Sequence, residues 1–353
     1  MKADMSLQLQ QHVQSAYEDK VALKIIGGNS KAFYGRAVTA ETISLAEHSG
    51  VLKYEPTELV ITVRSGTPLK EIEALLDEHG QMLPFEPPAF NEYATIGGTI
   101  ACNLSGPRRA YAGAARDYLL GCKIINGKGE MLTFGGEVMK NVAGYDVSRL
   151  VTGSMGTLGV LLQFSIKVLP KPVSTSTLIH PCAIDEALNL MNRIKGNPLP
   201  VDAVCYHEGN LYIRLSGSIS AVEAGCNQLS GDVFRDGELF WHQLREHKLA
   251  FFNTDKPLWR LSVKPSTPML ALDGDQLIDW GGAQRWLISE VPEQTIRAVS
   301  AEAGGHAILF RGGDRNGEVF HPLPSALMTI HQRLKNTFDP GGVFNPGTMY
   351  AEL

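Results

Sequence analysis

Two glycine-rich turns constrain the fold of this chain more than any other feature. They lie within the stretch 92–170, at residues 95–98 (TIGG) and 153–159 (GSMGTLG), and both flank runs of strand-like residues. A turn without side chains lets backbone amides approach a ligand closely, which a β-carbon would prevent. Neither turn has the G-x-G-x-x-G spacing between a strand and a helix that nicotinamide-binding folds use. The turns therefore indicate a bound ligand without the nicotinamide fingerprint.

Length and composition are those of an ordinary globular chain. The 353 residues suggest roughly two domains, and 44% hydrophobic with 20% charged residues excludes a disordered chain. The net charge of −5 gives no electrostatic reason to expect nucleic acid. Apolar runs such as 159–162 are too short to span a bilayer, and residues 1–11 lack the apolar segment of a secretory signal. We therefore expect a cytoplasmic protein.

The cysteines argue against a metal or cluster site in this chain. They number five and stand at Cys102, Cys122, Cys182, Cys205 and Cys226. They are widely spread and form no C-x-x-C pair, so neither a zinc site nor an iron–sulfur cluster is predicted. We expect reduced, buried thiols and no bound metal.

The hydrophobic pattern predicts alternating helices and strands with short connections. Helices are predicted over residues 6–20, 69–79, 184–194, 221–229 and 325–337. Strands are predicted over residues 22–26, 59–63, 203–206, 211–215, 259–263 and 307–310. The segment 170–172 (PKP) marks a domain boundary, because proline does not fit a central strand. The pattern is that of an α+β protein.

A third glycine-rich turn, residues 27–31 (GGNSK), directly follows the first predicted strand. Consecutive amides at such a turn can cradle a pyrophosphate, and the ammonium group of Lys31 would neutralise it. The alternative is a simple turn from a strand into a loop.

The stretch 92–170 resembles the FAD-binding domain of the vanillyl-alcohol oxidase and p-cresol methylhydroxylase (PCMH) family, and the resemblance extends to both termini. It implies an α+β, PCMH-type FAD-binding fold of two subdomains over residues 1–170. It also implies a small ferredoxin-like cap domain over 171–295 and a C-terminal segment, 296–353, that returns to the FAD domain. The motif DPGGVFNPG at 339–347 matches the family's returning segment.

The resemblance also implies which residues contact FAD. They fall in five segments: Gly27, Gly28, Asn29, Ser30 and Lys31; Thr95, Ile96, Gly97 and Gly98; Asn103, Ser105, Gly106 and Arg109; Gly153, Ser154, Gly156, Thr157, Gly159 and Val160; and Asn345. Many relatives carry a His or Cys in the first segment that bonds covalently to the flavin. Asn29, Ser30 and Lys31 stand there in this chain, so we expect non-covalent FAD.

Several neighbouring residues keep two interpretations. Arg108 and Arg109 would anchor a phosphate or favour the anionic reduced flavin, or they form a solvated basic turn. Arg116 and Asp117 are interpreted as a structural ion pair. The segment 140–146, which matches the family's G-Y-D motif, is either a loop buttress or a direct contact.

The substrate site is less evident than the cofactor site. Oxidation of a 2-hydroxy acid needs a cation for the carboxylate, a base for the hydroxyl proton and flavin N5 as hydride acceptor. The candidate cations are Arg260, Arg285 and Arg311, and the candidate bases are His306 and His321. We predict His306, Arg260 and Arg311 as the catalytic set. The run 304–322 resembles a metal-binding region of related dehydrogenases but lacks its paired histidines, so no metal is predicted there.

The resemblance implies one FAD-binding subunit of a glycolate (2-hydroxy acid) dehydrogenase complex that oxidises glycolate to glyoxylate. The chain lacks a cluster motif, so electrons would leave through a partner iron–sulfur subunit towards quinone. The implied partners are that subunit and a larger flavoprotein subunit, with peripheral association at the inner membrane through them. Two alternatives stay open: a non-catalytic FAD-binding structural or electron-relay subunit, and a stand-alone flavin oxidase of another hydroxy acid or alcohol.

Overall fold

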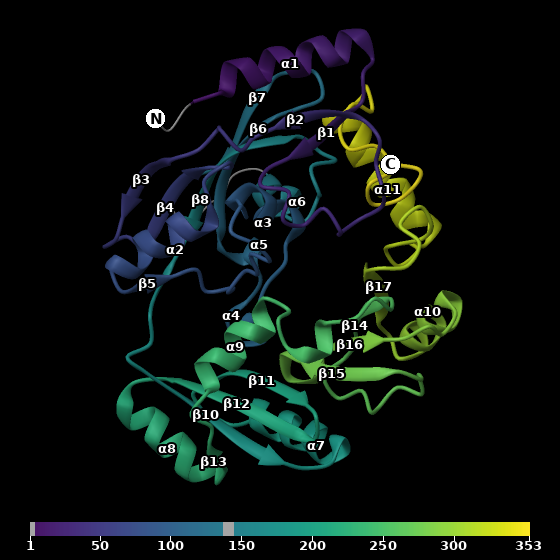
Figure 1. Cartoon of the computed structure of the whole chain (residues 1–353). Coiled ribbons are helices and arrows are strands. Elements are labelled where there is room, and N and C mark those ends of the chain that lie inside the picture. The colour runs from purple at the N-terminus through teal and green to yellow at the C-terminus, as the bar shows by residue number, and fades with distance from the viewer. Residues whose placement is uncertain (1–3, 137–144) are drawn as a thin grey trace.

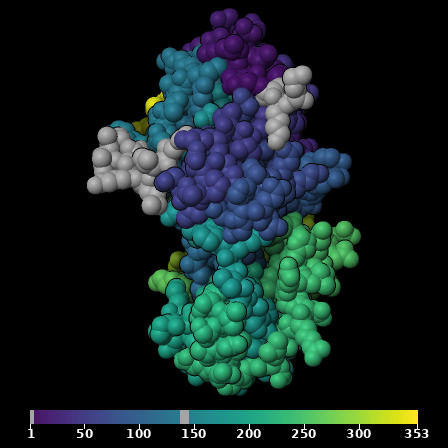
Figure 2. Space-filling view, turned by 90° about the vertical axis from the view of Figure 1, so that its left-hand side faces the viewer, coloured from purple at the N-terminus to yellow at the C-terminus, as the bar shows by residue number. Residues whose placement is uncertain are grey.

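The chain folds into two regions that lie one above the other (Figure 1). The computed structural model describes residues 4–136 and 145–353. The N-terminal region comprises residues 4–170 and is joined by the C-terminal tail, 325–353; the cap region comprises residues 174–311. Figure 2 shows the two regions as separate lobes in the space-filling view. Each predicted helix and strand is present, with ends that agree to within about two residues.

A five-stranded antiparallel sheet forms the centre of the N-terminal region, in the order β3-β4-β8-β6-β7. Its strands are β3 (Val51–Glu55), β4 (Val60–Arg64), β6 (Leu119–Ile125), β7 (Met131–Gly135) and β8 (Val160–Lys167). Strand β8 lies in the middle and is buried along most of its length, which explains its nearly continuous apolar sequence.

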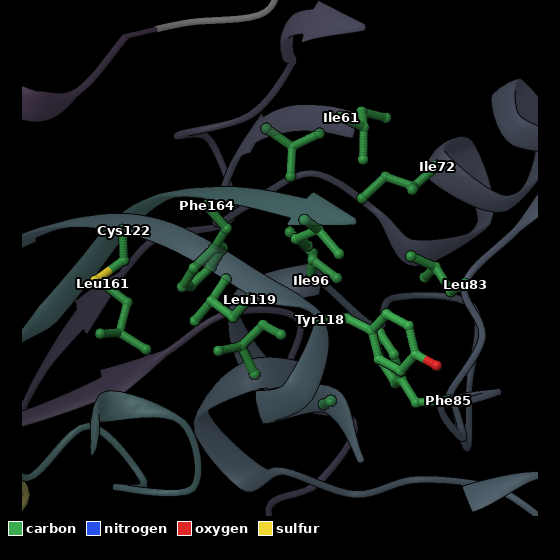
Figure 3. Close-up of a cluster of buried hydrophobic side chains, with 14 of the residues drawn as sticks. Ile61, Ile72, Leu83, Phe85, Ile96, Tyr118, Leu119, Cys122, Leu161 and Phe164 are labelled. Atoms are coloured by element: carbon green, nitrogen blue, oxygen red, sulfur yellow. The ribbon is translucent and has the colours of Figure 1, made fainter. Parts of the chain in front are cut away.

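Helices pack on this sheet and close a buried core. The longest is α2 (Leu69–Glu78), which begins after Pro68 and ends just before Gly80, as the sequence predicts. The shorter ones are α3 (Ile96–Cys102), α5 (Ala115–Tyr118) and α6 (Val147–Val151), whereas α4 (Arg109–Ala112) packs against the cap region. The strands β5 (Gln81–Met82) and β9 (Leu169–Pro170) form a separate two-stranded sheet. The core contains Ile72 of α2, Ile96 of α3 and Phe164 of β8, all inaccessible to solvent (Figure 3).

The C-terminal tail returns to the N-terminal region, as predicted. Strands β1 (Leu23–Ile26) and β2 (Glu41–Ser44) form a parallel pair beside helix α1 (Ser6–Asp19). The tail adds to this pair, because Leu23 donates to the carbonyl of Val343 at 2.7 Å and Asn345 donates to the carbonyl of Leu23 at 2.9 Å. Helix α11 (Ser325–Phe338) leads into the tail (Figure 1).

A buried lysine fixes the tail. Lys335 of α11 donates from Nζ to Asp339 Oδ2 at 2.7 Å, to the carbonyl of Phe344 at 2.7 Å and to the carbonyl of Thr157 at 2.9 Å. The carboxylate of Asp339 also accepts the amides of Val343 and Phe344. One buried ion pair therefore joins α11, the tail and the turn 153–159.

The first half of the cap region confirms the ferredoxin-like prediction. It runs β10 (Ser174–Pro181), α7 (Ile184–Lys195), β11 (Val201–His207), β12 (Asn210–Gly217), α8 (Ile219–Leu229) and β13 (Asp232–Val233). The strands lie in the order β13-β10-β12-β11, so this β-α-β-β-α-β unit has the ferredoxin-like arrangement. Helix α9 (Gly237–Arg245) and the short helix η1 (Ala250–Phe252) follow it.

The second half of the cap region extends the same sheet and corrects the predicted boundary at 295. It runs β14 (Leu258–Ser262), β15 (Asp275–Asp279), η2 (Trp280–Gly282), β16 (Gln284–Ile288), α10 (Glu293–Glu302) and β17 (His306–Arg311). Strand β17 pairs with β14, so residues 306–311 belong to the cap sheet and not to the returning segment. The cap sheet therefore has eight strands and is not small. Backbone pairing joins strands distant in sequence, which the local pattern does not record.

Candidate functional site

The glycine-rich turns 27–31 and 95–98 lie against each other at one end of the N-terminal region. An added Cβ at Gly28 would overlap the carbonyl of Tyr93, and one at Gly27 would overlap the hydroxyl of Thr95. The turn 27–31 therefore packs directly on the segment that leads into α3. The sequence predicts both turns as parts of one site, and the structure brings them together.

The amides of the two turns differ, which corrects the idea that both present free donors. In the turn 95–98, Ile96 donates to Thr67, Gly97 donates to Ser65, and Gly98 donates to the side chain of Thr95. The bond of Gly98 is a helix cap, because Thr95 is the N-cap of α3, whereas Ile96 and Gly97 pair with the backbone of the preceding loop. In the turn 27–31, by contrast, the described hydrogen bonds include none donated by the backbone amides of residues 28–31. The turn 27–31 is thus the better anion cradle.

The turn 153–159 packs on α3 and on the C-terminal tail. An added Cβ at Gly156 would lie 2.7 Å from Nδ2 of Asn345, and one at Gly153 would lie 3.1 Å from Cβ of Asn103. The side-chain amide of Asn345 accepts from the backbone of Ile25 at 2.8 Å and donates to the carbonyl of Met155 at 2.6 Å. Both ends of this amide brace the junction, a role that differs from the predicted contact with a flavin ring.

Polar groups without partners gather around α3. Buried side-chain oxygens that lack a hydrogen-bond partner include Ser65 Oγ, Thr99 Oγ1, Asn103 Oδ1 and Ser105 Oγ. Buried polar atoms without a partner are costly in a protein interior, so they indicate a bound polar group. These atoms and the free amides of the turn 27–31 fit a large ligand that carries both phosphates and hydrogen-bonding ring atoms.

Lys31 adds a buried positive charge to the same place. Its side chain is 8% exposed, and the described residues place no carboxylate at ion-pair distance from its ammonium group. Burial lowers the pKa of Lys31. The ammonium group lies over the ring of Phe90, whose centroid is 5.6 Å from Nζ. A diphosphate beside Lys31 would supply the missing negative charge.

The cap sheet presents a second polar group to these turns. Arg260 of β14 donates to the hydroxyl of Tyr34 at 3.2 Å and lines a cavity of about 20 Å³ between the two regions. Ser105, His247 and Gln284 line the same cavity, and each has a buried polar atom without a partner. The described residues place no carboxylate at ion-pair distance from Arg260. The cavity has room for about one water molecule.

His306 shares the face of Arg260. Ser262 pairs with His306 and Arg260 pairs with Ile308 in the same ladder, so the side chains of Arg260 and His306 emerge on one side of the sheet. Desolvation, and secondarily the charge of Arg260, lower the pKa of His306. His321 lies nearby, with 6.3 Å between the two ring centroids. Arg260 and His306, two of the three predicted catalytic residues, are therefore neighbours on the cap sheet.

The other candidate residues have structural contacts. Arg285 is fully buried on the opposite face of the sheet, where it donates to the carbonyls of Gly282 and Thr267. It therefore cannot meet a substrate beside Arg260, and burial lowers its pKa to about 10. The predicted catalytic Arg311 donates to the carbonyl of Phe252 at 2.6 Å and does not line the cavity. A local pattern cannot distinguish a buried strand arginine from an exposed one.

The structure adds residues that the sequence did not single out. Asp279 lines the cavity, and its burial raises the pKa of this carboxyl to about 7. His247 lines it with a left-handed backbone, φ 53°, which is uncommon for a residue with a side chain. Burial lowers the pKa of His247 well below its usual value, so the ring is neutral. The turn 279–282 (DWGG) was a readable signal, because it separates two apolar strands.

A buried ion network joins the two regions. Arg214 of the cap pairs with Glu86 of the N-terminal region at 2.9 Å and with Asp202 at 2.6 Å, and Arg108 completes the ring by pairing with Glu86 and Asp202. Arg108 is thus neither a phosphate anchor nor a solvated turn residue. Its neighbour Arg109 instead lies over the ring of Trp280, 4.5 Å from the centroid.

Two remaining predictions concern the periphery of the site. Arg116 and Asp117 form an exposed ion pair at 3.9 Å, which confirms their structural role. Of the segment 140–146, residues 140–144 lie outside the described residues, and Asp146 caps helix α6 through its side chain. No helix in the described parts of the chain is long and apolar enough to cross a membrane.

Comparison with known proteins identifies the family of this chain and its cofactor. A family model described as an FAD binding domain matches residues 3–135. The chain is 50% identical over 352 residues to the glycolate oxidase subunit GlcE of Escherichia coli (strain K12), and the match covers 100% of this chain and 99% of that protein. This chain belongs to the GlcE family of FAD-binding proteins. It is an FAD-dependent oxidoreductase, and FAD is the cofactor of the N-terminal region.

Other relatives match only part of the chain. The glycolate oxidase subunit GlcD of Bacillus subtilis (strain 168) is 34% identical over 129 residues, which are 36% of this chain and 27% of that protein. A D-lactate dehydrogenase of Anaerostipes hadrus is 33% identical over 139 residues, 39% of this chain and 29% of that protein. Among solved structures, alkyldihydroxyacetonephosphate synthase matches 96% of this chain and 74% of its own with a TM-score of 0.67 at 14% identity, which shows the shared PCMH-type fold.

Proposed function

We propose that this chain is the FAD-binding subunit of a glycolate (2-hydroxy acid) dehydrogenase complex and takes part in the oxidation of glycolate to glyoxylate. The observation that carries this proposal is the 50% identity with GlcE over the whole chain. The partners are a larger flavoprotein subunit and an iron–sulfur subunit, through which the chain associates peripherally with the inner membrane. Electrons pass to the iron–sulfur subunit and then to quinone, because the five cysteines of this chain are scattered.

The N-terminal region holds FAD without a covalent bond. The free amides of residues 28–31 and the ammonium group of Lys31 bind the diphosphate. The unpaired side chains of Asn103 and Ser105 bind the ring system, and Gly98, where an added Cβ would meet only Thr95, leaves space for the cofactor. When bound, FAD supplies the hydride acceptor. Acid precipitation should release all yellow colour into the supernatant, and colour retained in the pellet would contradict non-covalent binding.

The cap side of the cavity orients the substrate. Arg260 binds the carboxylate, since a guanidinium without a carboxylate partner has its donors available for one. His306 receives the hydroxyl proton, because its lowered pKa keeps the ring neutral and able to accept it. The two side chains share one face of the sheet; Arg260 lines the cavity between the regions, and His306 lies on the exposed part of the same face.

Anaerobic titration of the purified FAD-loaded chain with glycolate tests this proposal. Bleaching of the flavin band near ~450 nm is expected. Arg260→Gln should raise the glycolate concentration needed for half-reduction about tenfold or more, while Arg311→Gln serves as the matched control and leaves it unchanged. Ethylene glycol, which lacks the carboxylate, should not bleach the flavin. Equal effects of the two substitutions would refute the assignment of Arg260.

The small volume of the cavity supports a second candidate, an FAD-binding electron-relay subunit. A space of about 20 Å³ holds a water molecule but not a hydroxy acid. In that case the flavin of the isolated chain stays oxidised with glycolate. Glycolate-dependent dye reduction in cell membranes would still be lost when the gene is deleted. Full activity of the purified chain with oxygen as the sole acceptor would instead indicate a stand-alone oxidase.

A further inference from the structure

A tight turn projects from the cap sheet towards the FAD-binding region. It joins β15 to β16 and consists of Trp280 with φ 53°, Gly281 with φ 63° and Gly282 with φ 92°. The left-handed conformation costs a tryptophan about 1–2 kcal/mol, so the surrounding contacts must hold it in place. Asp279 Oδ1 accepts the amide of Trp280 at 2.7 Å, and Arg285 donates to the carbonyl of Gly282 at 2.8 Å from behind.

The strained residue makes two contacts with the other region. The indole Nε1 of Trp280 donates to the carbonyl of Gly106 at 3.0 Å. The guanidinium carbon of Arg109 lies 4.5 Å from the centroid of the Trp280 ring. A cation over an aromatic face is attracted by the ring quadrupole, most strongly for tryptophan. One cap side chain therefore holds both ends of the segment 106–109.

Arg109 has no carboxylate at ion-pair distance in the described parts of the chain, and its guanidinium instead lies over the ring of Trp280. Burial lowers the pKa of Arg109, and the charge of Arg260 from the cap lowers it further. A half-buried guanidinium that is repelled by a second cation needs an anion or an aromatic face to stay in place. The segment 106–109 follows Asn103 and Ser105, whose buried oxygens lack partners within the protein.

We propose that Trp280 is a positioning residue that directs Arg109 towards the bound FAD, so that the cap region sets both FAD affinity and the flavin reduction potential. A fixed cation near the flavin stabilises its anionic reduced form and raises the potential. Without the indole, Arg109 regains rotamer freedom and its charge is no longer held at the flavin. This inference rests on FAD binding alone and does not depend on the substrate.

A double-mutant cycle tests the proposal. Trp280→Leu, Arg109→Met and the double variant are prepared as apoproteins, and FAD affinity is measured by flavin fluorescence in the absence of glycolate. Each single substitution should weaken binding about threefold to thirtyfold, the range of a cation–π contact or a lost hydrogen bond. It should also lower the reduction potential of the reconstituted protein. The double variant should match the single ones, because both changes remove the same interaction.

Additive losses in the double variant, or wild-type FAD affinity and potential in Trp280→Leu, would overturn the proposal. The matched control is Trp259→Leu, because Trp259 also carries an arginine over its ring, Arg297 at 5.2 Å, but lies in the core behind the sheet. Trp259→Leu should lower the melting temperature and leave FAD affinity unchanged; an equal loss of affinity would mean that Trp280 acts only through cap stability.

A milder variant keeps the test decisive if Trp280→Leu fails to fold. Trp280→Phe retains an aromatic face for Arg109 and loses only the bond to Gly106. Its reduction potential should lie between those of the wild type and Arg109→Met. If Arg109→Met has the same flavin reduction potential as the wild type, the role assigned to the guanidinium is wrong.

Discussion

The FAD side and the cap side of the site differ in how they are built. On the FAD side the glycine turns fit backbone against backbone, as Gly28 does on the carbonyl of Tyr93 and Gly97 on Ser65. On the cap side, the face that carries Arg260 and Gln284 presents side chains with unmatched hydrogen-bonding groups. The glycine turns of the FAD side are therefore held by close backbone packing, whereas the cap face of the cavity is held less tightly and offers unpaired side-chain groups, as do the side chains around α3. Substitutions in the tightly packed glycine turns should lower the free energy of unfolding. Substitutions of the side chains that line the cavity should lower ligand binding or activity.

The brace beneath the FAD side should give the largest effect. Lys335→Met removes the charge that neutralises the fully buried carboxylate of Asp339. Breaking a buried pair from one side costs about 3–5 kcal/mol, and urea unfolding measures the loss. Adding Asp339→Asn should recover part of it, because the buried charge is gone. A loss below about 1 kcal/mol would mean that the tail does not support the FAD side.

A pair of glycine substitutions sharpens the same comparison. Gly28→Ala places a methyl group on the carbonyl of Tyr93 and should cost about 3 kcal/mol in the apoprotein. Gly98→Ala meets only Thr95 Oγ1 at 3.5 Å, an ordinary contact inside a helix, so it should leave the apoprotein as stable as the wild type.

The second measurement on this pair is FAD affinity. If the cofactor lies on the open side of Gly98, Gly98→Ala should weaken FAD binding about tenfold without a change in unfolding. Equal destabilisation of the apoprotein by Gly28→Ala and Gly98→Ala would contradict this prediction. It would mean that Gly98, like Gly28, is needed for packing within the protein and not for binding of FAD.

Local features of the fold were predictable from the sequence, whereas contacts between distant segments were not. The helices, the strands, the glycine turns and the returning tail were predicted, because each rests on local periodicity or turn chemistry. The cap boundary at 295 was wrong, since the pairing of β17 with β14 is not recorded in either strand. The contacts of Trp280 with Gly106 and of Arg214 with Glu86 span more than a hundred residues. Their chemistry appears only when the fold brings them together.

The smallest effect concerns Asp279, which holds the cap turn. Burial raises its pKa from 3.8 to about 7, so the fold favours the protonated form. The corresponding stability is present in acid and is lost as the pH rises through about 7. Asp279→Asn keeps an acceptor for the amide of Trp280 but cannot titrate. From about pH 6 to about pH 8 the wild type should therefore lose about 1 kcal/mol of unfolding free energy relative to this variant.

The matched control is Asp275→Asn, which removes an exposed carboxyl at the other end of β15 and should follow the pH profile of the wild type. Parallel pH profiles for the wild type and Asp279→Asn would contradict this prediction. They would show that the carboxyl of Asp279 is already ionised in the folded protein at about pH 6 and does not titrate between about pH 6 and about pH 8.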